Sequence, residues 1–167
     1  LSHLFKYADL KFTAFLGGVL KSENTNLINR GNKYAIVEAD EYDRSFLQLF
    51  PDYACITSID PDHLDIYGDH SQITKSFTEF SKKITEKLVL ASELDIEGLT
   101  YAVEKEATYY GSNVRANDGG YYFDLNTPGR IFKDVYLNLL GKHNLSNAIG
   151  AASLMHVAGL DIEKALP

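Results

Sequence analysis

The chain has 167 residues, a single cysteine and a formal net charge of −7, with 45% hydrophobic and 23% charged residues. This composition is typical of a globular domain and excludes an intrinsically disordered chain. The acidic balance argues against general binding to nucleic acids or anionic membranes, and one cysteine excludes an intramolecular disulfide framework. No stretch approaches the roughly 18 apolar residues of a membrane span, so we expect a soluble protein of the reducing cytoplasm.

The N-terminal segments predict a helix, a strand and a long loop. Residues 1–8 are typical of the end of a helix. Residues 11–16 alternate in polarity and then meet Gly17 and Gly18, which predicts a strand followed by a turn. The Asn-rich residues 21–32 predict a loop.

Buried strands and an amphipathic helix are expected next. Residues 34–37 and 53–59 are short apolar runs, each followed by acidic side chains, and residues 88–90 are a third such run. Within residues 71–86 the apolar positions are spaced by 4, 3 and 4, which predicts a helix. Cys55 lies in an apolar run and is expected to be a buried packing residue.

The amino-acid composition changes in the last third of the chain. Residues 107–138 are rich in aromatic side chains separated by turn signals, which predicts a small antiparallel meander. An Ala-rich helix is expected from Asn144 to Gly159. Strands that alternate with helices favour the α/β class, with a doubly wound, mostly parallel sheet to which the meander is added.

Two groups of acidic side chains follow the predicted strands, at the strand ends where open α/β sheets bind ligands. Mg²⁺ takes few direct protein ligands, and a carboxylate and an imidazole from neighbouring strand ends would suit it. The alternative is that both groups are solvated acidic loops. The candidates are Glu38, Asp40, Glu41 and Asp43 in the first group, and Asp60, Asp62, His63 and Asp65 in the second.

A pair of Asn residues opens the Ala-rich helix. Asn144 and Asn147 are three positions apart and share a helical face. An Asn amide both donates and accepts, which suits the edge of adenine, although Asn144 could instead cap the helix. A Gly-rich phosphate loop that ends in Gly-Lys-Ser/Thr is absent from the sequence.

Three segments together resemble the central, P-loop NTPase-like domain of the Mur ligases of peptidoglycan synthesis. They are 38–47 (EADEYDRSFL), 56–65 (ITSIDPDHLD) and 141–148 (GKHNLSNA). The resemblance points to the branch of the family that joins L-alanine to UDP-N-acetylmuramate. The ligase that attaches recycled murein tripeptide to the same sugar nucleotide is the alternative.

The resemblance implies an ATP-dependent ligase that requires Mg²⁺. In this family ATP activates a substrate carboxylate as an acyl phosphate, and an amine then displaces phosphate to form an amide. It implies that Glu38 and His63 are catalytic metal ligands and that His143, Asn144 and Asn147 contact adenine. It also places Gly17 and Gly18, more weakly, near the UDP-sugar substrate.

The sequence departs from the family pattern at both ends. The phosphate loop and the two flanking domains of the family are not found, so residues 1–167 are expected to form one truncated central domain, with 107–138 as a subregion within it. We expect such a chain to be inactive by itself, either as a nucleotide-binding module or without nucleotide affinity. We also expect it to self-associate through unpaired strand edges.

Overall fold

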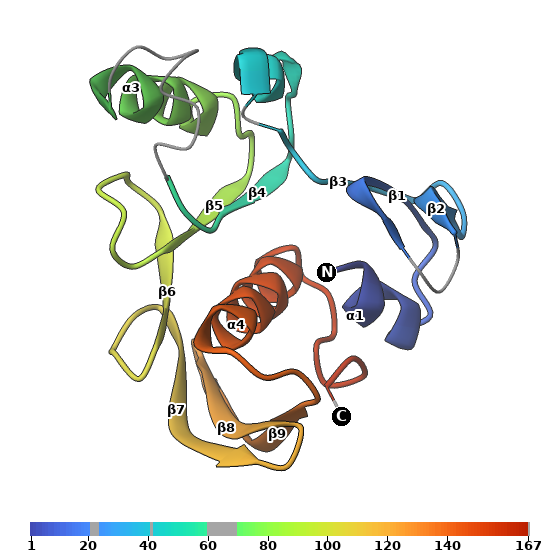
Figure 1. The fold of residues 1–167 in the computed structure, drawn as a ribbon, viewed down its shortest axis with the longest axis vertical. Coiled ribbons are helices and arrows are strands. Elements are labelled where there is room, and N and C mark those ends of the chain that lie inside the picture. The colour runs from blue at the N-terminus through green and yellow to red at the C-terminus, as the bar shows by residue number, and fades with distance from the viewer. Residues whose placement is uncertain (21–23, 41, 60–69, 167) are drawn as a thin grey trace.

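The computed structural model forms a small sheet and a large sheet, with helices between and around them (Figure 1). In the small sheet, β1 (Phe12–Leu20) lies between β2 (Thr25–Asn29), its antiparallel partner, and β3 (Tyr34–Val37), its parallel partner. The structure describes residues 1–20, 24–40, 42–59 and 70–166.

The large sheet has six strands in the order of the chain. Strands β4 to β7 are mutually parallel, and β7 to β9 continue the same sheet as an antiparallel meander. This arrangement confirms the expected mostly parallel α/β sheet with an antiparallel addition. The strands are β4 (Tyr53–Ile56), β5 (Lys87–Ala91), β6 (Leu99–Val103), β7 (Tyr109–Asn117), β8 (Gly120–Thr127) and β9 (Arg130–Leu137).

Helices cover both faces of the parallel part of this sheet. On one face, Leu88 and Leu90 of β5 pack in a cluster with Phe80 of α3. On the other face, Val89 and Ala91 join the main core, which includes the buried side of α4. The helical elements are α1 (Ser2–Tyr7), the 3₁₀ helix η1 (Tyr42–Gln48), α3 (His70–Ser81) and α4 (Lys142–Val157).

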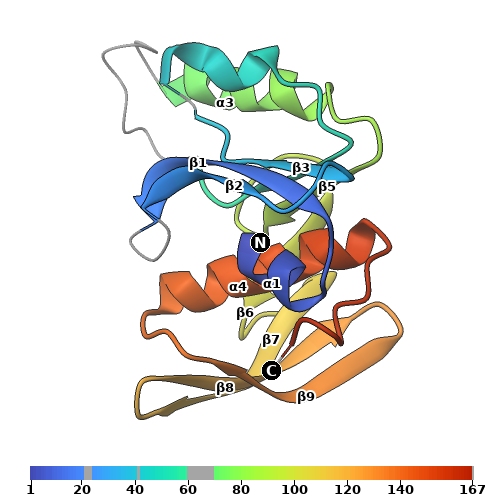
Figure 2. The same cartoon turned by 90° about the vertical axis from the view of Figure 1, so that its right-hand side faces the viewer.

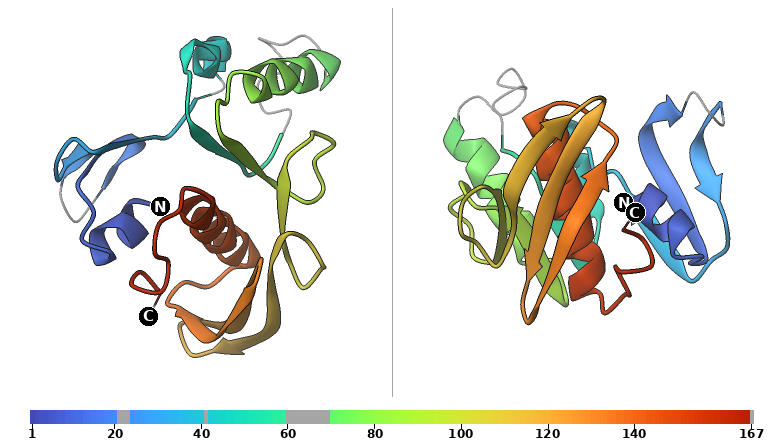
Figure 3. Two further views of the ribbon diagram at one scale, coloured as in Figure 1. Left: turned by 180° about the vertical axis from the view of Figure 1, so that it is seen from behind. Right: turned by 90° about the horizontal axis from the view of Figure 1, so that it is seen from below.

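Helix α4 is the centre of the main core. The views in Figure 3 place it between the meander on one side and the small sheet with α1 on the other. Its buried side includes Leu145 and Ile149, both 0% exposed, together with several small residues. Small side chains let a helix approach a sheet closely, so the Ala-rich composition of this segment has a direct structural use.

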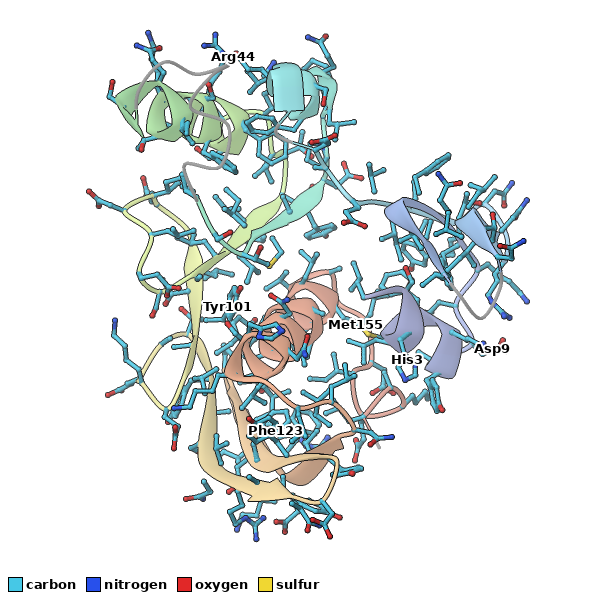
Figure 4. The ribbon with its side chains drawn as sticks, in the orientation of Figure 1. His3, Asp9, Arg44, Tyr101, Phe123 and Met155 are labelled. Atoms are coloured by element: carbon cyan, nitrogen blue, oxygen red, sulfur yellow. The ribbon has the colours of Figure 1, made fainter. Side chains whose placement is uncertain are left out.

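One close approach is between Gly150 of α4 and the ring of Tyr101 on β6, which lies between strand and helix (Figure 4). A Cβ atom on Gly150 would lie 2.9 Å from Tyr101 Cζ, so any larger residue there would displace the ring. The Tyr101 hydroxyl is buried and forms no well-aligned hydrogen bond with the described residues. Burial raises the pKa of Tyr101, and a weaker interaction with the Ser146 side chain of α4 opposes this rise.

Two expectations for the N-terminal region are wrong. Gly17 and Gly18 do not form a turn, because β1 continues through them to Leu20. Residues 21–32 are not all loop, because 25–29 form β2. This strand is polar and buries only Ile28 among its five residues, so it lacks the apolar run that identifies a buried strand.

Strand β6 was not predicted from the sequence. The remaining elements that were predicted are present, with their ends shifted. The helix expected at residues 71–86 ends at Ser81, and the Ala-rich helix begins two residues early, at Lys142.

Cys55 of β4 is half-buried against the main core, and burial raises its pKa to about 12. None of the described helices is long and apolar enough to cross a membrane.

Asp124 ties the three strands of the meander together. Its carboxylate accepts a hydrogen bond of 2.7 Å from the Asn113 amide on β7 and one of 3.0 Å from the Asp134 N–H on β9. Both partners have φ above +50° and lie at irregularities in the strand register. The Asn113 hydrogen bond, followed by that of Asp134, holds the pKa of Asp124 below its usual range.

We expect Tyr101→Phe to leave the free energy of unfolding unchanged or to raise it by about 1 kcal/mol, because an unpartnered buried hydroxyl is costly to desolvate. Urea unfolding measures this change. Tyr109→Phe is the matched control, since the buried Tyr109 shares a hydrogen bond of 3.0 Å with His156 Nδ1. The free energy of unfolding of this control is expected to fall by about 1 kcal/mol. A similar fall in both variants would contradict the inference that the Tyr101 hydroxyl lacks a partner.

We expect Asn113→Gly to raise the pKa of Asp124, since it removes the amide donor while glycine tolerates the φ of +51°. The depressed pKa stabilises the fold above the unfolded value of about 3.9, and this contribution is lost as pH falls through the folded pKa. The variant should therefore lose less stability on acidification below pH 4. Carboxyl NMR titration checks the pKa, with Asn32→Gly as a remote control; an unchanged Asp124 pKa contradicts the assignment.

Candidate functional site

The carboxylate of Glu38 is held at the end of the β1–β3 pair. Glu38 directly follows β3, and its N–H donates to the Phe15 carbonyl at 2.9 Å. Its side-chain Oε2 accepts a hydrogen bond of 2.9 Å from the Gly17 N–H. Glu38 is an exposed residue beside the strand end. The structure thus brings together two predicted site residues, Glu38 and Gly17, that are 21 positions apart.

The segment after Glu38 is fixed by an aromatic anchor. The Phe46 ring of η1 is 3% exposed and packs 5.0 Å from the Phe77 ring and 5.2 Å from the Phe80 ring of α3. The Asp40 carbonyl accepts hydrogen bonds from the Ser45 hydroxyl at 2.8 Å and the Phe46 N–H at 3.1 Å. These contacts tie the acidic stretch to α3, whereas the Glu38 side chain stays at the surface.

The second half of the predicted metal site cannot be placed. His63 lies outside the described residues, as do Glu41, Asp60, Asp62 and Asp65, and the same holds for the side chain of Asp43. Within the described residues, no group of three or more His, Cys, Asp or Glu side chains could hold a metal ion.

A single carboxylate nevertheless fits the needs of Mg²⁺. This ion is commonly bound through one or two carboxylates and takes its other oxygen ligands from water and substrate phosphates. Glu38 offers a hard oxygen ligand that is exposed and oriented by Gly17.

The first turn of α4 carries the other predicted site residues. Gly141 precedes the helix with φ of +103°, a conformation that favours glycine. The Asn144 amide donates a hydrogen bond of 2.7 Å to the Leu140 carbonyl, so it secures the chain before the helix but is not the N-cap residue. Asn147, one turn later, is exposed.

His143 lies against the same turn. A Cβ atom on Gly141 would be 2.7 Å from His143 Cε1 and 3.5 Å from Asn144 Nδ2, so both side chains crowd this glycine. The first turn of α4 carries no acidic residue, which leaves the positive end of the helix dipole free to attract negative charge. Sequence reasoning missed the role of Gly141, although a glycine directly before a polar helix start is a usable signal.

The carboxyl ends of β1 and of its parallel partner β3 point toward the side of the molecule at which the first turn of α4 lies. In Figure 2 the first turn of α4 and the hairpin end of β1 and β2 both lie toward the left of the view. A hollow of about 440 Å³ lies elsewhere, on the meander, and none of the predicted site residues lines it. Its lining includes Tyr110, Asn126 and Arg130.

A known protein-family model matches most of the chain. The model of the Mur ligase middle domain matches residues 19–155, which include Glu38, His63 and the first turn of α4. Gly17 and Gly18 lie just before the matched range.

Curated relatives share the sequence over almost the whole chain. The UDP-N-acetylmuramate–L-alanine ligase of Flavobacterium johnsoniae is 46% identical over 161 residues, which cover 95% of this chain and 36% of the relative. The enzyme of the same name from Christiangramia forsetii is 46% identical over 164 residues, which cover 97% and 36%. The chain therefore spans little more than a third of the length of these relatives.

Solved structures share the fold. The UDP-N-acetylmuramate–alanine ligase from Thermotoga maritima superposes with a TM-score of 0.85 and 27% identity, over 99% of this chain and 39% of that one. A Thermotoga maritima MurF ligase, solved in complex with ADP, superposes with a TM-score of 0.71 at 15% identity, over 98% of this chain and 44% of that one. The second likeness concerns the fold alone.

Proposed function

This chain belongs to the Mur ligase family through its middle domain, and we propose that it is the ATP- and metal-binding part of a ligase that joins L-alanine to UDP-N-acetylmuramate. The observation that carries the proposal is the 46% identity with two L-alanine ligases over nearly the whole chain. The peptidoglycan precursor would then be made in the cytoplasm, where ATP is available.

The proposed reaction has two steps. The terminal phosphoryl group of ATP passes to the carboxylate of the sugar nucleotide, which gives an acyl phosphate and ADP. The amine of L-alanine then attacks the acyl carbon, an amide bond forms and phosphate leaves. Phosphoryl transfer depends mainly on positioning and on neutralising charge, so the residues that hold cation and nucleotide carry most of the catalysis.

We assign Glu38 and His63 as the ligands of a divalent cation, with Mg²⁺ as the ion that the carboxylate chemistry suits. A bound cation offsets the negative charge that develops on the phosphoryl oxygens. The support for Glu38 is its exposed carboxylate, which the Gly17 N–H holds at the end of β3. The support for His63 is its place in the segment that resembles the family.

We assign the first turn of α4 to the adenine base. Asn147 is exposed and can both donate to and accept from the base edge. Asn144 uses one amide hydrogen on the Leu140 carbonyl, which fixes its side chain at the start of the helix. The His143 ring lies against Gly141, as does the Asn144 amide. Gly17 and Gly18 follow the part of β1 that pairs with β3, and we keep them as weaker candidates for contact with the sugar nucleotide.

Calorimetric titration with Mg²⁺ and a non-hydrolysable ATP analogue tests these assignments. We expect Asn147→Ala and Glu38→Ala each to weaken binding by about tenfold, because each removes a ligand contact of roughly 1–2 kcal/mol. His63→Ala is expected to behave like Glu38→Ala.

Two matched variants serve as controls for this titration. Asn32→Ala and Glu86→Ala change exposed residues of the same types away from the site, and both are expected to bind like the unchanged chain. If all the variants and both controls bind equally well, the placement of the nucleotide and cation on these residues is contradicted.

We also propose that the chain self-associates through strand edges. Among the described strands, β3 pairs only with β1 and β4 pairs only with β5, so each presents one unpaired edge. Val37 on β3 is 47% exposed, and an exposed apolar edge strand is a template for pairing with another chain.

Sedimentation velocity at rising protein concentration tests this association. We expect a dimer that Val37→Lys weakens, because a charged side chain on an edge strand opposes pairing. Leu139→Lys places the same charge at a residue of similar exposure, 55%, outside the strands, and should not affect the dimer. A monomer at every concentration would contradict the proposal.

A further inference from the structure

The side chain nearest to the open face of Gly17 is that of Glu38. Its N–H donates to Glu38 Oε2 at 2.9 Å. A Cβ atom on Gly17 would lie 3.3 Å from both Cδ and Oε1 of Glu38 and 3.6 Å from Oε2. The carboxylate of Glu38 therefore packs directly against the backbone of Gly17.

The strand register explains why this N–H is available. β1 and β3 pair in parallel from Phe12 with Tyr34 to Phe15 with Val37, and the Glu38 N–H then donates to the Phe15 carbonyl. In a regular parallel ladder the next donor, the Gly17 N–H, would bond to the backbone carbonyl of Glu38. Here its acceptor is the carboxylate of Glu38 instead. The side chain takes over the ladder position where β3 ends.

The pairing of β1 with β2, its other neighbour, is interrupted around Gly17. β1 and β2 pair up to Phe15 and resume only at Leu20, because the register shifts between those residues. Gly17 thus lies in the irregular part of β1, where its hydrogen bond to the Glu38 carboxylate takes the place of one ladder bond to β3.

We propose that Gly17 is a positioning residue for the metal-binding carboxylate of Glu38, an inference that rests on the proposed function of Glu38. The Gly17 N–H holds Oε2, and the missing side chain leaves room for the carboxylate, which leaves Oε1 for the cation. Groups that orient a metal ligand in this way commonly change metal affinity by about 10–100-fold when they are altered.

Gly18 provides a matched control. A Cβ atom on Gly18 would meet nothing within 4 Å, and neither Gly17 nor Gly18 has a positive φ that would strain an alanine. Gly17→Ala and Gly18→Ala therefore make the same chemical change at adjacent strand positions. They differ in whether the new methyl group presses on Glu38.

The test uses the whole 167-residue chain and Mn²⁺ as a paramagnetic probe. We expect Mn²⁺ to broaden the amide NMR signals around Glu38 in the unchanged chain and in Gly18→Ala at the same concentration. Gly17→Ala should need a Mn²⁺ concentration about tenfold higher for the same broadening. Glu38→Gln, which keeps an oxygen for the Gly17 N–H but lacks the charge, should lose the selective broadening.

Hydrogen exchange of the Gly17 amide is a second readout that needs no metal. Slow exchange is expected in the unchanged chain and in Glu38→Gln, and fast exchange in Glu38→Ala, where the acceptor is gone. Unprotected exchange in the unchanged chain would overturn the proposal.

The outcomes separate this inference from the proposed function. If Glu38→Gln loses Mn²⁺ but Gly17→Ala binds it like Gly18→Ala, the metal assignment stands and the positioning role of Gly17 is overturned. If Glu38→Gln binds Mn²⁺ like the unchanged chain, or no signal is selectively broadened, the metal assignment of Glu38 fails and the role of Gly17 fails with it.

Discussion

Helix α4 can lie close to the large sheet because Gly150 leaves room for the ring of Tyr101. The helix buries Leu145 and Ile149 completely on the same side, and the main core extends from this contact to the meander, α1 and the small sheet. Close packing of this kind fixes the helix along its length. Its first turn, which carries His143, Asn144 and Asn147, is therefore held in place from the core outward.

The small sheet holds the side chain of Glu38, the proposed metal ligand, in a defined orientation. It does so where β3 ends, by substituting a carboxylate for a backbone carbonyl in the ladder with β1. The ring of Phe46 in η1 packs against α3 and so fixes the chain after Glu38. The two halves of the site thus depend on rigid elements, the sheet on one side and α4 on the other, which suits a reaction governed by positioning.

The family of the chain and its structure bear on different aspects of the proposed function. The match to the Mur ligase middle domain and the 46% identity to L-alanine ligases carry the chemistry of the proposed reaction. The structure adds how two of the site's parts are held, through the Gly17 N–H and through the turn at Gly141. Neither contact is visible in a motif, since a motif names side chains and these contacts are made by backbone.

The sequence alone determined the α/β class, the parallel strands β3, β4 and β5, the meander and helix α4, because each has a strong apolar period or clear turn residues. It also identified Glu38 and Asn147 as candidates through their residue types and neighbours. It could not give β2, which is polar and half-exposed, or the path of β1 through Gly17 and Gly18, because glycine permits turn and strand alike. Only the tertiary structure decided that Gly17 meets Glu38, because strand register, set by packing of distant segments, brings together residues 21 positions apart.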